Sequence, residues 1–150
     1  MTVYLVDTNI IAYLADVGSP YHENIRAHFQ ALTDQDSVYL SILTLYELYY
    51  SLAKAQESAV SQAIIRTKEQ ICATLPCLPL SESGARIFGE LKMRYQKHSS
   101  VKKNVLDRAT VDLVIASTAI ESNAILVSND DIYGRVQSLW PDFRWENWTV

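Results

Sequence analysis

Four acidic residues lie within or directly after segments whose apolar patterns indicate strands or helices. Asp7 comes directly after the apolar run VYLV, and Asp130 follows AILVS within the segment SNDD. Glu47 lies in SILTLYELYY, and Asp112 stands at the head of the pattern DLVIASTAI. A carboxylate beside a buried segment costs free energy unless it is hydrogen-bonded, paired with a cation or bound to a metal ion. These motifs contain no Lys or Arg, so a metal ion is a candidate partner.

The ligand types at these four positions restrict the metal. All are carboxylates, and none is His or Cys, so the sequence favours a hard cation such as Mg²⁺ or Mn²⁺ over Zn²⁺. Such ions polarise a phosphate, activate bound water and stabilise a leaving oxygen. The chemistry that this set predicts is the hydrolysis of phosphodiester bonds.

The placement of the four acids depends on the elements that carry them. Apolar runs predict strands at VYLVD, SVYLSI and AILVS, with short or edge strands at LPCLPL and FRWENWTV. HSSVKKN is expected to be a loop. In the first half of the chain, helical patterns lie at NIIAYLAD, from the Gly18-Ser19-Pro20 break to about Ala31, and over about 45–73, where two helices are expected. In the second half they run from Glu82 to about Lys97, onward from Thr110, and from Asp131 to Ser138. This alternation predicts an α/β fold with a central parallel sheet covered on both faces.

A parallel sheet would gather the acids at one edge. The carboxyl ends of parallel strands meet there, and ligands of open α/β folds bind there. Asp7 and Asp130 directly follow strands, and Glu47 is expected in the first turn of the helix after the second strand. Asp112 is expected at the mouth of its helix, on the apolar stripe that packs against the sheet.

Each acid also has a simpler interpretation. Asp7 could cap a helix, Thr44 to Glu47 fits a capping box, Asp112 suits a first turn, and Asp130 could be a turn residue. Capping does not explain why four acids without a nearby cation share one edge. A divalent metal ion does.

Other catalytic groups are not supported by their surroundings. His22 and His28 fall in a helical pattern and His98 in the expected loop, which favours surface positions. The chain contains no GxSxG motif, and its four glycines form no phosphate-binding loop. Cys72 and Cys77 in CATLPC lack metal or CxxC spacing, and both are expected to be buried thiols.

Composition and charge narrow the class of protein. The chain has 150 residues, 49% apolar and 20% charged, which is typical of one soluble globular domain. No apolar run is long enough for a membrane span and no signal peptide is visible, so we expect a cytoplasmic protein. The net charge of −4 argues against a general nucleic-acid coat protein.

Basic residues are concentrated in one segment. Residues 86–108 contain seven basic and two acidic side chains, a net charge of +5 against −9 for the remainder. Two interpretations stay open. The segment could hold a phosphodiester beside the metal site, or it could be a solvated helix face followed by a charged loop.

The combination of VDTNIIAYL, SILTLYEL and VDLVIASTAIESNAILVSND resembles the PIN-domain family. The short format is similar to the VapC-type toxin ribonucleases of VapBC toxin-antitoxin pairs, and it implies that residues 1–150 form a single PIN-like domain. The motifs are spread over nearly the whole chain. The family's acidic positions correspond to Asp7, Glu47, Asp112 and Asp130, its first-motif Asn to Asn9, and the polar position two before the last acid to Ser128.

The resemblance implies a three-layer α/β/α fold, Mg²⁺- or Mn²⁺-dependent endoribonuclease activity, homodimerisation, and inhibition by a cognate antitoxin whose tail occupies the active-site groove. Asp7 and Asp112 would be the principal metal ligands. Glu47 would be a ligand or would position the attacking water, and Asp130 would serve a second, weaker ion or its water. Ser128 would hydrogen-bond at the site, and Asn9 would support it.

Several assignments stay open at this stage. Asp131 could exchange roles with Asp130, although Asp130 has the expected spacing from Ser128. Asp107 could be an accessory ligand, a cap or a loop residue. The segment HSSVKKNVLDRATVD differs from the short connector of many toxins of this group, and its lysines could serve RNA binding. Three tyrosines of one helix suit either an interface or the core, with the core expected: Tyr46, Tyr49 and Tyr50.

Two rival functions remain. The chain could be a PIN-like binding or scaffold protein that has lost turnover while its acids remain as caps. It could also be an α/β phosphohydrolase with Asp7 as the nucleophile. The second rival usually needs another acid two residues later, and this chain has Asn9 there.

Overall fold

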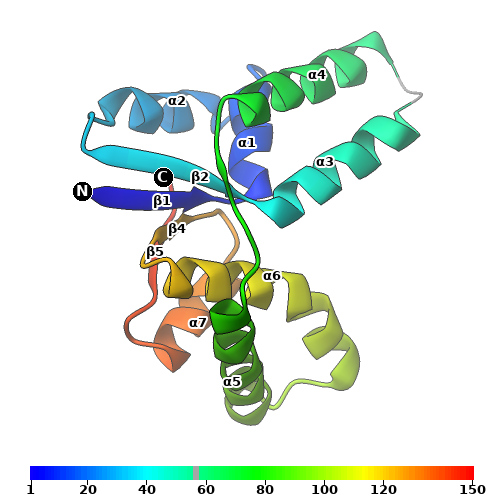
Figure 1. Ribbon diagram of the computed structural model, residues 1–150. Coiled ribbons are helices and arrows are strands. Elements are labelled where there is room, and N and C mark those ends of the chain that lie inside the picture. Colours follow the sequence, from blue (N-terminus) through cyan, green and yellow to red (C-terminus); the bar gives the residue numbers. More distant parts are fainter. Residues whose placement is uncertain (56–57) are drawn as a thin grey trace.

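A five-stranded parallel sheet lies at the centre of the molecule (Figure 1). The structure is a computed structural model that describes residues 1–55 and 58–150. Within these residues the strand order is β3-β2-β1-β4-β5, and every neighbouring pair is parallel. The strands are β1 (Thr2–Val6), β2 (Asp36–Ser41), β3 (Cys77–Leu78), β4 (Ile125–Val127) and β5 (Arg144–Glu146). As predicted, LPCLPL and the aromatic tail supply the two edge strands.

Helices cover both faces of the sheet, which confirms the predicted three-layer α/β/α fold. In Figure 1 the first four helices lie on one side of the sheet and the last three on the other. The helices are α1 (Thr8–Ala15), α2 (His22–Ala31), α3 (Ile42–Lys54), α4 (Ala59–Ala73), α5 (Glu82–Ser99), α6 (Lys103–Glu121) and α7 (Ile132–Leu139). The stretch predicted as two helices is α3 and α4, and residues 56–57 between them lie outside the described residues.

Alternation along the central strands separates two cores. Leu5 and Leu126 point to the face covered by α5, α6 and α7, and Val6 and Val127 point to the opposite face, towards α1 to α4. All four side chains are fully buried. Successive side chains of a strand point to opposite faces, so a short apolar run suffices to fill both cores.

The start of α3 differs from the prediction. Ser41, the last residue of β2, caps this helix, and its hydroxyl accepts a hydrogen bond from the Leu43 amide at 3.1 Å. Thr44 and Glu47 therefore do not form a capping box, and Glu47 lies in the second turn rather than the first. The β2–α3 junction has no loop, because one serine both ends the strand and caps the helix.

The start of α6 also differs, and this changes the setting of Asp112. The helix begins at Lys103, so the loop predicted over HSSVKKN is confirmed only at residues 100–102, and His98 belongs to α5. Leu106 and Ala109 are buried and extend the apolar stripe back from Leu113. Asp112 consequently lies in the middle of a helix, and the interpretation as a first-turn acid is wrong.

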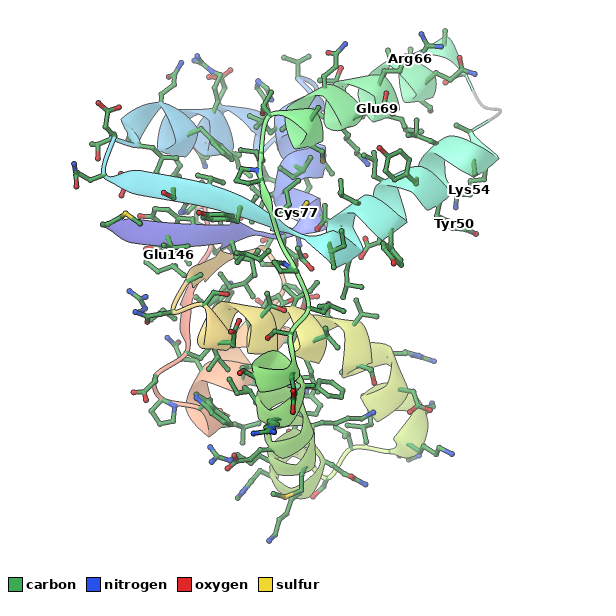
Figure 2. All side chains as sticks on the ribbon, in the orientation of Figure 1. Tyr50, Lys54, Arg66, Glu69, Cys77 and Glu146 are labelled. Carbon is green, nitrogen blue, oxygen red and sulfur yellow. The ribbon has the colours of Figure 1, made fainter. Side chains whose placement is uncertain are left out.

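The hairpin of α3 and α4 carries exposed aromatic side chains. Tyr46, Tyr49 and Tyr50 are 70%, 58% and 66% exposed, so their predicted core position is wrong. Figure 2 shows Tyr50 and Lys54 near the outer end of α3, and the Lys54 ammonium lies 4.8 Å from the centre of the Tyr50 ring. These rings are therefore available for contact with another molecule.

Two further expectations concern the cysteines and the membrane. Cys72 and Cys77 are both unpaired thiols, but only Cys72 is buried, and Cys77 in edge strand β3 is half-buried. In the described part of the chain, every helix is too short or too polar to cross a bilayer.

Candidate active site

Asp7 occupies the point where the sheet reverses its strand order. The chain proceeds from β1 to β2 and β3 on one side, and β4 and β5 are added on the other side of β1. Asp7 directly follows β1, and its amide donates to the carbonyl oxygen of Val127 at the end of β4. Ligands of open α/β sheets bind at such switch points. The reversal thus places Asp7 at the expected ligand crevice.

The carboxylate of Asp7 is buried and held from two sides. Only 7% of the residue is exposed. As the N-cap of α1, its Oδ1 accepts a hydrogen bond from the Thr8 amide at 2.8 Å. Its Oδ2 accepts one from the Ser128 hydroxyl at 2.8 Å. The capping interpretation of Asp7 is therefore correct, and one carboxylate oxygen also faces the end of β4.

Ser128 and Asn9 join the carboxyl ends of β1 and β4. The Ser128 oxygen accepts hydrogen bonds from the Asn9 side-chain amide and from the Asp130 backbone amide, each at 3.1 Å. The Asn9 side-chain oxygen accepts a hydrogen bond from the Asn129 backbone amide at 3.3 Å. With both of its acceptor contacts taken, Ser128 directs its proton at Asp7. These two residues lie where a supporting role requires them.

Tyr133 is a site residue that the sequence did not reveal. It is fully buried in α7, and its hydroxyl lies 3.5 Å from both Asp7 Oδ2 and Asp112 Oδ1, the limit of hydrogen bonding. The two carboxylate oxygens are therefore no further apart than twice this distance. Tyr133 follows Asp130 by three residues, so a helical reading from Asp130 places both on one face, and this spacing was the only available signal.

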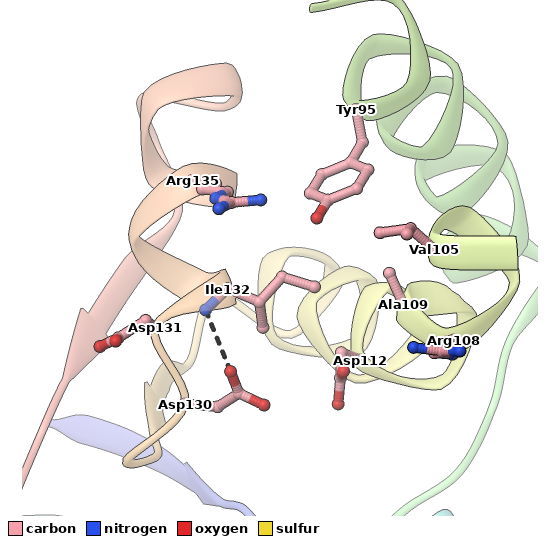
Figure 3. A pocket seen from close by; sticks show the side chains of 9 residues that line it. All are labelled: Tyr95, Val105, Arg108, Ala109, Asp112, Asp130, Asp131, Ile132 and Arg135. Atoms are coloured by element: carbon pink, nitrogen blue, oxygen red, sulfur yellow. Dashed lines mark hydrogen bonds between the residues drawn. The ribbon is translucent and has the colours of Figure 1, made fainter. Parts of the chain in front are cut away.

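Asp130 combines a turn role with an exposed position in the site. Its Oδ1 accepts a hydrogen bond from the Ile132 amide at 3.1 Å, so the interpretation as a turn residue is correct for this oxygen (Figure 3). The side chain is exposed. It can therefore still offer an oxygen to a ligand.

One cavity brings all four predicted acids together. It has a volume of about 300 Å³ and is lined by Asp7, Thr8, Asn9, Ala12, Glu47, Asp112 and Asp130. Glu47 reaches the cavity from α3, and this residue is exposed. The hydroxyl of Thr8, which also lines the cavity, lies 3.1 Å from the Thr44 hydroxyl. Four segments that are distant in the sequence thus contribute carboxylates to a single space, which we call the acid cavity.

None of the acids of this cavity forms an ion pair with Lys or Arg in the described part of the chain, although the charge of Lys68 acts on Glu47. The ion pairs found there are Arg26 with Glu23, Arg86 with Glu82, and Arg94 with Glu90, and each joins neighbouring turns of one helix. Surface pairs of this kind contribute little to stability. The negative charge of the acid cavity is therefore not balanced by these side chains.

Crowding and burial disfavour ionisation of these acids. Burial raises the pKa of Asp7, against the hydrogen bonds from Ser128 and Thr8. Burial, and then the charges of Asp130 and Asp7, raise the pKa of Asp112 to about 6. Burial also raises the pKa of Glu47, although part of its side chain reaches the surface. A divalent cation would remove this repulsion.

The donor set fits a hard cation that keeps part of its water shell. Its members are carboxylate oxygens, without imidazole or thiolate. Across residues 1–55 and 58–150, no three Asp, Glu, His or Cys side chains form a complete ligand set. Mg²⁺ is usually held by one or two carboxylates together with several waters. An ion held by one or two of these carboxylates and by water would therefore match the donor set.

The remaining acids and histidines lie elsewhere. Asp131 lines a neighbouring cavity, and Asp107 is exposed on α6 and lines neither of the two. His22 lies against the Tyr13 carbonyl oxygen, and His28 stacks on Trp148. These positions give Asp107 and the two histidines no direct contact with the acid cavity.

The sequence and the fold of this chain are similar to those of known proteins. The model of the PIN domain family matches residues 4–139. The protein named ribonuclease VapC2 of Rickettsia felis is 26% identical over 148 residues, covering 97% of this chain and 98% of the relative. The structure of VapBC2 from Rickettsia felis bound to a promoter DNA fragment gives a TM-score of 0.74 at 25% identity, with 97% and 98% of the chains covered. VapBC-1 from nontypeable Haemophilus influenzae gives 0.73 at 25%, with 99% and 100% covered.

The raised pKa of Asp112 predicts a pH-dependent gain in stability when the residue is neutralised. An acid with a folded-state pKa near 6 and an unfolded value near 3.8 opposes folding above about pH 6, and this penalty is gone below about pH 4. In EDTA at pH 7.5, Asp112→Asn should raise the free energy of unfolding by about 1 to 2 kcal/mol after allowance for solvent screening.

Chemical unfolding between pH 7.5 and pH 4 would measure this difference, which should shrink as the pH falls. Asp107→Asn, on the same helix outside the acid cavity, is the matched control and should stay within about 0.5 kcal/mol of the wild type. A constant difference between Asp112→Asn and the wild type at all pH values would contradict the prediction.

Proposed function

Since the chain belongs to the PIN domain family, we propose that it is a metal-dependent endoribonuclease and the toxin of a VapBC-type toxin-antitoxin pair. The observation that carries this proposal is the meeting of four carboxylates in one cavity, none of which forms an ion pair with Lys or Arg among the described residues. Uncompensated carboxylates at a switch point suit the binding of a metal ion and a phosphodiester. The name of the relative, ribonuclease VapC2, supports RNA as the substrate.

The proposed cofactor is Mg²⁺ or Mn²⁺, with Asp7 and Asp112 as its principal ligands. Both carboxylates approach the same Tyr133 hydroxyl, which supports their joint action. Glu47 would be a further ligand or would orient the attacking water, and Asp130 would bind a second, weaker ion or a water. When bound, the ion would activate water and stabilise the charge that develops on the phosphate.

The chain's own residues would keep the ligands in place. Ser128, held by Asn9, and the Thr8 amide fix both oxygens of Asp7. Burial and the neighbouring carboxylates raise the pKa of Tyr133 well above its usual value, so its hydroxyl keeps its proton and remains a donor. A rotamer fixed by such contacts loses little freedom when a ligand binds.

We further propose that residues 1–150 act as one domain in the cytoplasm. In support of one domain, β1 near the start and β5 near the end belong to the same sheet. In support of the location, cleavage of cellular RNA requires access to the compartment that holds it.

The proposed protein partners are a cognate antitoxin and a second copy of the chain. The solved VapBC complexes of Rickettsia felis and Haemophilus influenzae support the antitoxin, because the likeness covers nearly the whole of both chains. The exposed rings of Tyr46, Tyr49 and Tyr50 support contact with another protein, because aromatic side chains are enriched in interfaces. Homodimerisation stays a prediction.

Cleavage of structured RNA in Mg²⁺ is the direct test of the activity. The purified chain should cleave within RNA, and Asp7→Asn should lower the rate more than about 100-fold, since even supporting residues of metal sites cost about 10- to 100-fold. Sequencing of the cleaved ends gives the site of cleavage. Asp107→Asn should cleave at the wild-type rate.

The same assay separates the rivals. Release of phosphate from small esters without RNA cleavage would favour the phosphohydrolase. Absence of both activities in folded protein with Mg²⁺ or Mn²⁺ would favour the scaffold protein.

Metal binding should stabilise the folded chain. Addition of millimolar Mn²⁺ after EDTA treatment should raise the melting temperature by several degrees, because a ligand at about 100 times its Kd contributes about 2.7 kcal/mol. Asp7→Asn and Asp112→Asn should lose most of this response, whereas Asp107→Asn should keep it. An unchanged melting temperature of the wild type at millimolar Mn²⁺ would argue against a metal site.

The antitoxin proposal predicts rescue of growth. Expression of the chain alone should arrest bacterial growth, and co-expression of the protein encoded beside its gene should restore growth, because the partner would block the acid cavity. The two proteins should also co-purify. Asp7→Asn should not arrest growth but should still co-purify, and arrest by Asp7→Asn would show that toxicity does not depend on the site.

A further inference from the structure

A second cavity adjoins the acid cavity. Its volume is about 320 Å³, at the lower end of the roughly 300–1,000 Å³ typical of ligand pockets. Asp112 and Asp130 line both cavities. Figure 3 shows these two acids at one side of the second cavity, with Tyr95 and Arg135 facing them from the other. We call this space the arginine cavity, after Arg108 and Arg135 in its lining.

The two arginines are not engaged by the described residues. Arg108 precedes Asp112 by four residues and Arg135 follows Asp131 by four, yet neither pair forms an ion pair, unlike three other helical pairs of this chain. A basic residue placed before an acidic one is the weaker arrangement on a helix, which fits Arg108. Asp131 points away from Arg135 in Figure 3. Both guanidinium groups are therefore available to a ligand.

Tyr95 is an independent indication that the cavity offers a hydrogen-bond donor to a ligand. The residue is only 2% exposed, and its hydroxyl forms no hydrogen bond within the described residues. Every fully enclosed side-chain oxygen or nitrogen of the described residues has a hydrogen-bond partner. The Tyr95 hydroxyl has none, so it is not fully enclosed, and it opens into the arginine cavity that Tyr95 lines. Buried tyrosine hydroxyls usually have a hydrogen-bond partner. The missing partner of Tyr95 would be supplied from the cavity.

We propose that the arginine cavity binds a backbone phosphate of the RNA next to the phosphate that is cleaved, through Arg108, Arg135 and the Tyr95 hydroxyl. This proposal rests on the ribonuclease function proposed above. All three groups donate hydrogen bonds, and the planar guanidinium matches the oxygens of a phosphate. The strand would then cross from the arginine cavity to the acid cavity over their shared residues, Asp112 and Asp130.

Three hydrogen-bond donors and the carboxylates of Asp112, Asp130 and Asp131 line the cavity, and the donors suit a phosphate better than a base. Recognition of a base by stacking needs an exposed aromatic face, and the Tyr95 ring is buried. The donors also come from three helices, α5, α6 and α7, so the spacing of the backbone positions that carry them is set by the packing of the core. A phosphate held there would set the position of the strand relative to the carboxylates.

The proposal also divides the basic segment 86–108 by position. Arg86 and Arg94 are engaged with Glu82 and Glu90 on α5. Arg108 is the basic residue of the segment that lines the cavity, and Figure 3 shows it on α6 near Asp112. The contact with RNA is thus assigned to particular side chains and not to the charge of the whole segment.

Kinetics of three variants test the proposal. Arg108→Gln and Arg135→Gln should each lower kcat/KM for RNA about tenfold, mostly through KM, and Tyr95→Phe should lower it a few-fold. Each arginine variant should also reduce the dependence of log Kd on log salt by about 0.7 for single-stranded RNA. Arg66→Gln, an exposed arginine on α4 remote from both cavities, is the matched control and should behave as the wild type (Figure 2).

A neutral phosphate identifies the contact. A methylphosphonate placed at single positions around the mapped cleavage site should lower wild-type kcat/KM about tenfold at one neighbouring position. The same substitution should have little further effect in Arg135→Gln, because its phosphate contact is already lost. Equal losses in the wild type and in Arg135→Gln, or no sensitive position, would overturn the proposal.

Two further outcomes separate this proposal from others. Arginine variants that cleave normally but escape inhibition by the antitoxin would assign the cavity to the protein partner and refute the phosphate site. Fluorescence anisotropy in the Asp7→Asn background measures the binding of the same RNAs without cleavage, and the effect of the arginine substitutions on this binding decides the phosphate contact. Absence of cleavage by the wild type counts against the ribonuclease, whereas normal binding by the arginine variants counts against the arginine cavity. Melting temperatures of the variants should match the wild type.

Discussion

The burial of the Asp7 carboxylate is the constraint on which the site depends. Asp7 lies between the two central strands, where the sheet reverses its order, and an isolated charge there would be costly. The Thr8 amide and the Ser128 hydroxyl reduce this cost, and they also fix the direction of both oxygens. The other acids add repulsion, which raises the pKa of Asp112 to about 6. The fold thus maintains a concentration of negative charge that a cation would relieve.

Structural and functional roles coincide at some acids and separate at others. Asp7 caps α1, and Asp130 accepts a hydrogen bond from the first turn of α7. A structural role alone could therefore account for both acids, even in a protein without activity. Asp112 has neither role, because it lies in the middle of α6. Glu47 lies in the second turn of α3, which Ser41 already caps. These two acids give the stronger argument for a ligand site, since no local structural need accounts for them.

Hydrogen-bond donors are unevenly divided between the two adjoining cavities. Carboxylates line the acid cavity, whereas Arg108, Arg135 and the Tyr95 hydroxyl line the adjoining one together with Asp112, Asp130 and Asp131. This division would suit a metal ion beside a phosphate chain, because each needs groups of the opposite charge. The overall negative charge of the chain is therefore compatible with a nucleic-acid substrate, as local placement decides the contact.

The sequence by itself determined the order of strands and helices and both edge strands, and it singled out the four acids as candidates, because short apolar runs and their following polar residues are local signals. It did not determine the starts of α3 and α6, since Ser41 serves two elements and the apolar stripe through Leu106 and Ala109 is interrupted by charged residues. Only the tertiary structure decided the shared cavity, the contact of Tyr133 with Asp7 and Asp112, and the cluster of Tyr95, Arg108 and Arg135. These groups come from distant segments, and their distances follow from packing across the sheet, which no local pattern records.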